Sequence, residues 1–261
     1  MNPVEAAVLG IVQGLTEFFP VSSSGHLAIF QALFGGREGG GLLFEVAVHV
    51  ATLVAIALFY RARIAALVLG TLRRDRAALD YVARLAVATL PAVAVGLGAR
   101  DAVEAQFSNG IVVGAALLVT GVIVFSTRWT APQATLAIPG WGAVLLIGIA
   151  QAFAVLPGIS RSGSTVAMAL ALGIAPRAAA EFSFLLGIIA IAGAAVLTLP
   201  ELGAADASML WAIGIGGFAA LVSGLTAIWI FVRMLDRSVF HHWAWYCWVV
   251  GLAFLVWQGL A

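Results

Sequence analysis

The sequence predicts an all-α integral membrane protein, with six transmembrane helices and two re-entrant helical hairpins arranged as an inverted-topology repeat. Composition is the first observation: 63% of the 261 residues are hydrophobic, 10% are charged, and the mean hydropathy is +1.09. Soluble domains have only about 45–50% apolar residues. The other observations are a series of long apolar segments and two apolar segments that polar residues interrupt. We expect a single membrane domain over residues 1–261.

Six uninterrupted apolar segments predict the transmembrane helices, because each can cross a hydrocarbon core about 30 Å thick. They cover residues 42–60, 80–99, 110–127, 178–199, 208–232 and 242–260. The N-terminal segment lacks the basic region and cleavage site of a signal peptide and carries Glu5 and Glu17. We therefore expect it to remain in the mature protein.

Two further apolar segments predict hairpins that enter the membrane and return. They span residues 3–34 and 138–173, and the stretches "PVSSSG" and "PGISRSG" interrupt them. Each arm of roughly 15–18 residues would be about 24 Å long at 1.5 Å per residue, which is marginal for a full crossing. A hairpin fits this length better than a span.

Arginine distribution predicts the orientation, since cytoplasmic loops are enriched in basic residues. If the six helices alternate, nine arginines fall on one side, which we assign to the cytoplasm: Arg61, Arg63, Arg73, Arg74, Arg76, Arg128, Arg177, Arg233 and Arg237. The first hairpin then enters from outside and the second from the cytoplasm.

An internal repeat supports this inverted arrangement. With an offset of 138 (151 − 13), four residues of the first hairpin meet identical residues of the second: Gln13 and Gln151, Ser22 and Ser160, Ser24 and Ser162, Gly25 and Gly163. A segment with a glutamate, Glu45 or Glu181, follows each hairpin. We expect repeats over about 1–127 and 138–261, with both glutamates as structural supports.

The interruptions predict an anion site. Non-helical backbone at membrane depth is tolerated only where protein buries it or a wet cavity exposes it. Proline ends the first arm of each hairpin, and serine caps the free N–H groups of the second. Helix N-termini favour anions, and Arg161 adds a planar donor pair suited to phosphoryl oxygens. Two such termini aimed at one point predict a pocket for a diphosphate.

Residues beside this pocket bear on the choice between a transporter and an enzyme. Inverted repeats with broken helices are typical of secondary transporters. A carboxylate at Glu17 would repel a transported anion, whereas a phosphatase can use it to hold a cation or to orient His26. Ser22 and Ser23 are candidate nucleophiles and His26 is a candidate base.

The stretches "QGLTEFFPVSSSGH" and "PGISRSGST" resemble the two signature motifs of bacterial undecaprenyl-diphosphate phosphatases of the bacitracin-resistance type, and "FEVAVH" and "EFSFLL" resemble further family segments. The resemblance covers essentially the whole chain. It implies four catalytic residues: Glu17, Ser23, His26 and Arg161. It also implies a set of residues around the diphosphate: Gln13, Ser22, Ser24, Ser160, Ser162 and Thr165. Many members carry Glu where this chain has Gln13.

The resemblance implies hydrolysis of a polyprenyl diphosphate to polyprenyl phosphate and inorganic phosphate, which recycles the lipid carrier of cell-wall synthesis. It also implies Mg²⁺ or Ca²⁺ as cofactor, with Glu17 as the metal ligand. The nucleophile stays open between Ser23, His26 and water. The alternative to an enzyme is a lipid-phosphate or anion transporter. Acid-phosphatase-like lipid phosphatases are disfavoured because the chain has no lysine for their first motif.

Partners and location follow from the same observations. We expect membrane lipids and the polyprenyl diphosphate as partners, and no nucleic acid; a homodimer is one alternative for the oligomeric state. The expected location is the bacterial cytoplasmic membrane, with the site open to the outer face. Cys247 is the only cysteine, which excludes an internal disulfide. We expect His49 to pair with Glu45, and His241 and His242 to lie in an interfacial aromatic belt.

Overall fold

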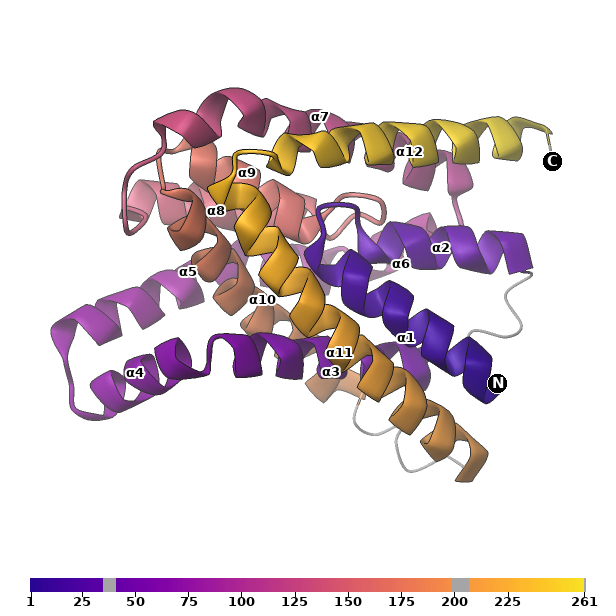
Figure 1. Cartoon of the computed structure of the whole chain (residues 1–261), viewed down its shortest axis with the longest axis horizontal. Coiled ribbons are helices and arrows are strands. Elements are labelled where there is room, and N and C mark those ends of the chain that lie inside the picture. The colour runs from indigo at the N-terminus through magenta and orange to yellow at the C-terminus, as the bar shows by residue number, and fades with distance from the viewer. Residues whose placement is uncertain (35–40, 199–206, 261) are drawn as a thin grey trace.

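The computed structural model describes residues 1–34, 41–198 and 207–260, and this part of the chain is built of helices joined by short connections (Figure 1). The α-helices are α1 (Pro3–Phe18), α2 (Ser23–Phe34), α3 (Gly41–Phe59), α4 (Arg61–Leu72), α5 (Arg76–Gly98), α6 (Arg100–Phe107), α7 (Gly110–Thr130), α8 (Trp141–Phe153), α9 (Arg161–Ala171), α10 (Pro176–Thr198), α11 (Ala207–Asp236) and α12 (Trp243–Leu260). Two 3₁₀-helices are η1 (Ala131–Gln133) and η3 (Phe240–His242).

Five of the six predicted apolar segments coincide with helices that are able to cross a membrane, and the segment 42–60 qualifies only together with the helix that follows it. By length and composition, 5 helices of the described chain qualify: α5, α7, α10, α11 and α12. A sixth candidate is α3 together with α4, which bend by 79° between Leu43–Phe59 and Arg61–Leu72. The all-helical membrane class is therefore confirmed, with five to six candidate spans. Residue 199, the end of one predicted segment, lies outside the described residues.

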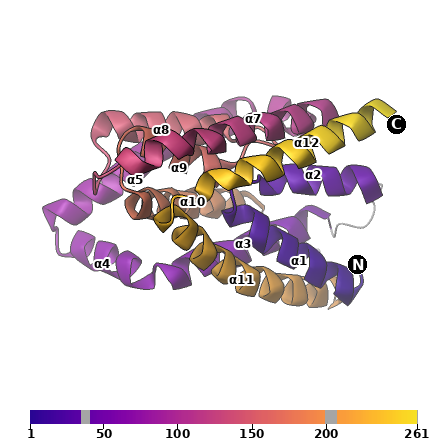
Figure 2. The ribbon, with the colours of Figure 1, turned by 45° about the horizontal axis from the view of Figure 1, so that its top comes forward.

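The two interrupted segments each form a pair of short helices. In the first, α1 and α2 form a V whose break covers residues 19–22 (Figures 1 and 2). In the second, α8 packs against α9 across a break at residues 154–160. The longest of these four helices, α1, has 16 residues, or about 24 Å of rise. Each arm is therefore shorter than the hydrocarbon core, which is about 30 Å thick.

Serine side chains restart the helix after each break, as the sequence predicted. Ser160 is the N-cap of α9, and its Oγ accepts a hydrogen bond from the Gly163 amide at 3.1 Å. In the first hairpin, Ser22 Oγ accepts from the Gly25 amide at 3.2 Å. Ser22 has a φ of 66°, in the left-handed region that non-glycine residues rarely adopt. The break is thus a specific local structure rather than a frayed helix end.

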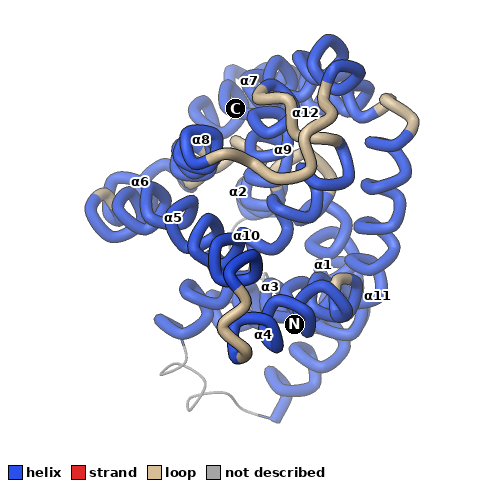
Figure 3. Tube along the Cα trace, turned by 90° about the vertical axis from the view of Figure 1, so that its left-hand side faces the viewer, coloured by secondary structure: helices blue, strands red, loops and turns tan. Residues whose placement is uncertain are grey.

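Close helix contacts fix the hairpins in the bundle. In Figures 1 and 2, α1 lies along α11, and α7 lies along α12; α8 packs on α5. In Figure 3, α2 and α9 lie inside the bundle, with α5 and α6 at one edge and α11 at the other. The two hairpins meet there, since Ser162 Oγ in the first turn of α9 donates to the Phe19 carbonyl, in the break of the first hairpin, at 3.4 Å.

Gly10 allows α1 to approach α11 closely, because a Cβ at this position would lie 2.1 Å from the Gly216 carbonyl oxygen. Gly10→Val is expected to lower the free energy of unfolding by about 1–3 kcal/mol and the thermal midpoint by roughly 3–10 °C. Thermal unfolding in detergent measures this. Gly96→Val is the matched control, since a Cβ at Gly96 meets nothing within 4 Å. Equal shifts for both variants would contradict the packing argument.

Candidate active site

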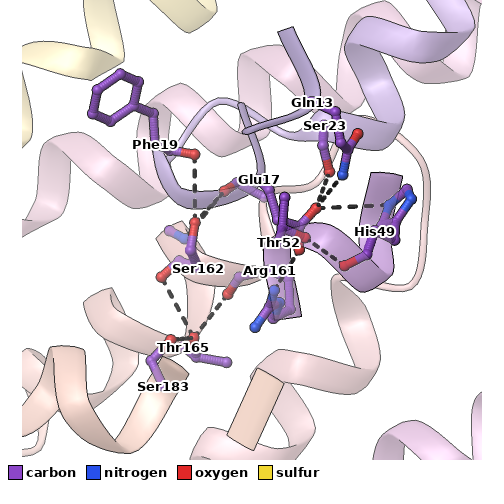
Figure 4. Close-up of polar contacts among 12 residues, drawn as sticks. Gln13, Glu17, Phe19, Ser23, His49, Thr52, Arg161, Ser162, Thr165 and Ser183 are labelled. Carbon is purple, nitrogen blue, oxygen red and sulfur yellow. Dashed lines mark hydrogen bonds and ion pairs between the residues drawn. The ribbon is translucent and has the colours of Figure 1, made fainter. Parts of the chain in front are cut away.

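Glu17 and Arg161 join the two hairpins. Glu17 lies in the last turn of α1, and Arg161 is the first residue of α9. Arg161 Nη2 lies 2.5 Å from Glu17 Oε1, and the two side chains are 16% and 7% exposed (Figure 4). Buried ionised groups are stable only when they are paired and hydrogen-bonded. This ion pair is therefore the charged centre of the contact between the hairpins.

The other oxygen of Glu17 gathers polar side chains from the first half of the chain. Oε2 accepts hydrogen bonds from Ser23 Oγ at 2.7 Å and from Gln13 Nε2 at 3.0 Å. His49 Nε2, from α3, lies 3.7 Å from the same oxygen (Figure 4). Glu17 is therefore placed to hold Ser23 and to accept its proton.

Ser160 and Ser162 of the second hairpin, with the neighbouring Thr165, are engaged by protein groups, whereas the buried Ser164 Oγ has no hydrogen-bond partner among the described residues. Ser160 Oγ lies 3.3 Å from Ser162 Oγ, and the Ser160 amide donates to Thr120 Oγ1 at 3.0 Å. Thr165 Oγ1 donates to the Arg161 carbonyl at 2.8 Å and lies 2.6 Å from Ser183 Oγ of α10. Thr165 is fully buried. These contacts hold α9 in place and fix the backbone of Arg161.

A cavity of about 170 Å³ lies where the hairpins meet. Its lining includes six of the predicted site residues: Glu17, Ser22, Ser23, Ser24, Ser160 and Arg161. His49 also lines it, whereas Gln13, His26, Ser162 and Thr165 are not part of its lining. Most of its lining side chains are polar, so the cavity suits a small polar group.

Unsatisfied polar atoms remain beside this cavity. Arg161 Nη1 and Gln13 Oε1 are buried and have no hydrogen-bond partner among the described residues. Buried polar atoms without partners cost about 1–3 kcal/mol each. Two helix N-termini, those of α2 and α9, also meet at this point, and each carries a positive partial charge. Arg161 Nη1 is therefore a donor, and Gln13 Oε1 an acceptor, without a partner among the described residues, and only the donor suits an anionic ligand.

His26 lies elsewhere than the sequence suggested. Its Nδ1 is 2.8 Å from the Ser22 carbonyl oxygen and its Nε2 is 2.8 Å from the Tyr246 hydroxyl of α12. We expected Ser23, His26 and Glu17 to converge, but the structure joins Ser23 to Glu17 directly. The catalytic role of His26 stays a prediction.

The structure adds two residues that sequence reasoning did not place in the site. His49 Nδ1 lies 2.7 Å from the backbone oxygen of Glu45, while its Nε2 faces Glu17. An imidazole inside an apolar helix was the available signal for His49. Tyr246 had no sequence signal, because it lies 220 residues from His26. Glu181, the glutamate that follows the second hairpin, accepts a hydrogen bond from Arg63 Nε at 2.8 Å and does not line the cavity.

The described side chains do not by themselves form a metal centre. No group of three or more His, Cys, Asp and Glu side chains that could hold an ion occurs among them. Glu17 already accepts from Arg161, Ser23 and Gln13. Mg²⁺ and Ca²⁺ need six or more oxygen ligands. A resident metal therefore does not fit this donor set.

The fold and the site define a helical membrane protein with a polar cavity between two broken-helix hairpins. A family model described as "Bacitracin resistance protein BacA" matches residues 6–253. The chain belongs to this family.

Relatives match over nearly their full length. An "Undecaprenyl-diphosphatase" from Desulforapulum autotrophicum is 39% identical over 98% of this chain and 98% of its own. One of the same name from Desulfatibacillum aliphaticivorans is 37% identical over 98% of this chain and 99% of its own. A third, from Methanococcus maripaludis, is 34% identical over 94% of this chain and 96% of its own.

Proposed function

We propose that the protein hydrolyses undecaprenyl diphosphate to undecaprenyl phosphate and inorganic phosphate, and so recycles the lipid carrier for cell-wall synthesis. One observation carries the proposal: Glu17, Ser23 and Arg161 converge on a polar cavity between two helix N-termini. The names of the relatives agree with it. A transporter is not favoured, because a carboxylate that holds a serine hydroxyl is arranged for chemistry rather than for passage of an anion.

Arg161 binds the diphosphate in this proposal. Its Nη1 has no hydrogen-bond partner among the described residues, and its Nη2 donates to Glu17. Nη1 is therefore free to bind before the substrate arrives, and Nη2 becomes free when the diphosphate displaces Glu17. Charge-assisted bonds of this kind are roughly twice as strong as neutral ones. The same exchange takes the positive charge away from Glu17 and makes it a better proton acceptor.

Ser23 is the proposed nucleophile. Its Oγ attacks the terminal phosphorus, its proton passes to Glu17, and the bond from that phosphorus to the bridging oxygen breaks. Undecaprenyl phosphate leaves, and water then cleaves the phosphoserine to give inorganic phosphate. The 2.7 Å hydrogen bond from Ser23 Oγ to Glu17 Oε2 supports this assignment over direct attack by His26. Arg161 and the N-termini of α2 and α9 stabilise the charge that develops on the phosphoryl oxygens.

A divalent cation is proposed to enter with the substrate, bound mainly through phosphoryl oxygens. Mg²⁺ is commonly held by one or two carboxylates together with substrate phosphates. Glu17 is the carboxylate that lines the described cavity, and it would be the side chain to hold such a cation. The chemistry such a cation supplies is neutralisation of phosphate charge.

The proposed topology is an inverted repeat of re-entrant hairpins, over about 1–127 and 138–261. Equivalent helix contacts support it. The first arm of each hairpin packs on a helix of the other repeat, α1 on α11 and α8 on α5. The helices that follow the hairpins pack on the same two helices, α3 on α11 and α10 on α5. The serine clusters also correspond, with Ser22 Oγ 3.2 Å from Ser24 Oγ and Ser160 Oγ 3.3 Å from Ser162 Oγ. We propose that the site opens to the outer face of the cytoplasmic membrane; the homodimer stays a prediction.

The orientation is tested by labelling from one side. Ser24 lines the cavity, so Ser24→Cys in a Cys247→Ala background is expected to react with an impermeant thiol reagent applied to the outer face of spheroplasts. The Cys247→Ala protein alone is the control. Labelling of the cysteine only when the cytoplasmic face is exposed would reverse the proposed orientation.

The activity is tested with purified protein and undecaprenyl diphosphate in detergent, by measuring inorganic phosphate. We expect release by the wild type and none above background by Arg161→Ala. A parallel assay in vesicles follows movement of undecaprenyl phosphate or free phosphate across the bilayer. Transport without phosphate release would replace the phosphatase by the transporter.

A further inference from the structure

We propose that Tyr246 is a positioning residue that fixes the tautomer and orientation of His26, for which the sequence predicts an acid–base role in the hydrolysis; this rests on the function proposed above. The Tyr246 hydroxyl lies 2.8 Å from His26 Nε2. The two rings are nearly parallel, with centroids 5.6 Å apart and an interplanar angle of 11°. The contact joins α12 to the N-terminal half of α2.

The partners of the imidazole determine where its proton lies. Nδ1 faces the Ser22 carbonyl oxygen at 2.8 Å, and a carbonyl only accepts, so Nδ1 carries the hydrogen. In the neutral ring Nε2 is then an acceptor, and the Tyr246 hydroxyl donates to it. A hydroxyl both donates and accepts. Tyr246 can therefore also receive a hydrogen bond from Nε2 when His26 gains a proton, and it supports both states of the ring.

Two neighbours of Tyr246 hold α12 against the break of the first hairpin. The ring of Trp243 stacks on Phe19, with centroids 4.5 Å apart and an interplanar angle of 26°. Cys247 Sγ donates to the Pro20 carbonyl at 3.4 Å. Residues 243, 246 and 247 follow the three- and four-residue spacing of one helix face. These two contacts fix α12, and with it the Tyr246 hydroxyl, relative to His26.

The position of Tyr246 also favours a lasting hydrogen bond. The residue is 40% exposed and lies in the first turn of α12, and the His26 imidazole is a hydrogen-bond partner of its hydroxyl. Removal of that imidazole would leave the hydroxyl without this partner at a partly buried position. The hydroxyl and the imidazole thus stabilise each other, and His26 keeps one orientation beside Ser22, which lines the cavity.

Tyr246→Phe removes the hydroxyl and keeps the ring. We expect kcat to fall about tenfold or more, because general acid–base groups contribute about 10²–10⁴-fold, while KM changes less than about twofold, because Tyr246 does not line the cavity. Trp245→Phe is the matched control, since Trp245 is 59% exposed and contacts Phe125 and Trp248 instead. Unchanged kcat in Tyr246→Phe overturns the proposal while leaving the phosphatase assignment intact.

Nitrogen NMR gives a second readout that does not depend on activity. The chain has 4 histidines, and ¹⁵N-histidine labelling with a His26→Gln reference assigns the His26 signals. In the wild type we expect a protonated Nδ1 and an unprotonated Nε2 that accepts a hydrogen bond; in Tyr246→Phe we expect the Nε2 signal to shift or to average between tautomers. A wild-type His26 with its proton on Nε2, or a spectrum that Tyr246→Phe leaves unchanged, overturns the proposal. The wild-type spectrum alone tests the tautomer if Tyr246→Phe does not fold.

Discussion

Arg161→Lys is expected to lose at least about a hundredfold in turnover with undecaprenyl diphosphate while the protein stays folded and inserted. Loss of a single donor to a developing oxyanion costs about 10²–10³-fold in other enzymes. Arg161 uses Nη2 for Glu17 and has Nη1 without a partner, so the guanidinium can serve two acceptors at once. A lysine ammonium keeps the charge but is a single point and lacks the planar fork.

Phosphate release by purified Arg161→Lys at saturating substrate measures this loss. Arg177→Lys is the control, because Arg177 is 77% exposed and pairs with Asp236 at 2.8 Å, away from the cavity lining. Thermal unfolding separates chemistry from folding: Arg161→Ala leaves Glu17 as an unpaired buried charge and is expected to lose about 3–5 kcal/mol of unfolding free energy, whereas Arg161→Lys should lose less. Near-normal turnover of Arg161→Lys would mean that Arg161 contributes only its positive charge.

Local rules explain why much of the fold could be predicted. Apolar length marks the candidate spans, and proline followed by serine marks each break, because capping depends on residues three apart. Ser160 caps α9 as this rule requires. Arg161 and Glu17 were also predictable as site residues, since an ionised group among apolar neighbours is expensive without a function. Their direct contact was not, because it joins residues 144 apart in the chain.

Long-range packing explains what the sequence did not predict. His49 reaches Glu17 only because α3 lies beside α1, and Tyr246 reaches His26 only because α12 packs on the first break. Reasoning along one helix paired His26 with Ser23, whereas the folded chain engages both nitrogens of the imidazole with other partners. The bend of 79° between α3 and α4 falls where the predicted segment 42–60 ends, but the helix α4 that continues from it was not predicted.

Glu17→Gln is expected to reduce phosphate release by about 10²–10⁴-fold, the usual contribution of a general base. The amide still fits beside Arg161 and can accept one hydrogen bond, but it cannot take the proton of Ser23. The matched controls are Glu17→Asp, which keeps the charge on a shorter side chain and should retain part of the activity, and Glu5→Gln, which changes an exposed glutamate in the N-terminal capping box.

A titration of Glu17→Gln with Mg²⁺ or Ca²⁺ separates the two roles open to this carboxylate. If Glu17 is the proton acceptor, added cation leaves the variant inactive, because no ligand exchange restores a base. If Glu17 is mainly a ligand for the cation that enters with diphosphate, activity recovers in part as the concentration rises, since a neutral amide binds a hard cation more weakly than a carboxylate does. Wild-type turnover of Glu17→Gln at every cation concentration would contradict both roles. The ion pair with Arg161 would then serve only to hold the two hairpins together. The proton of Ser23 would have to pass to His49, whose imidazole also lines the described cavity.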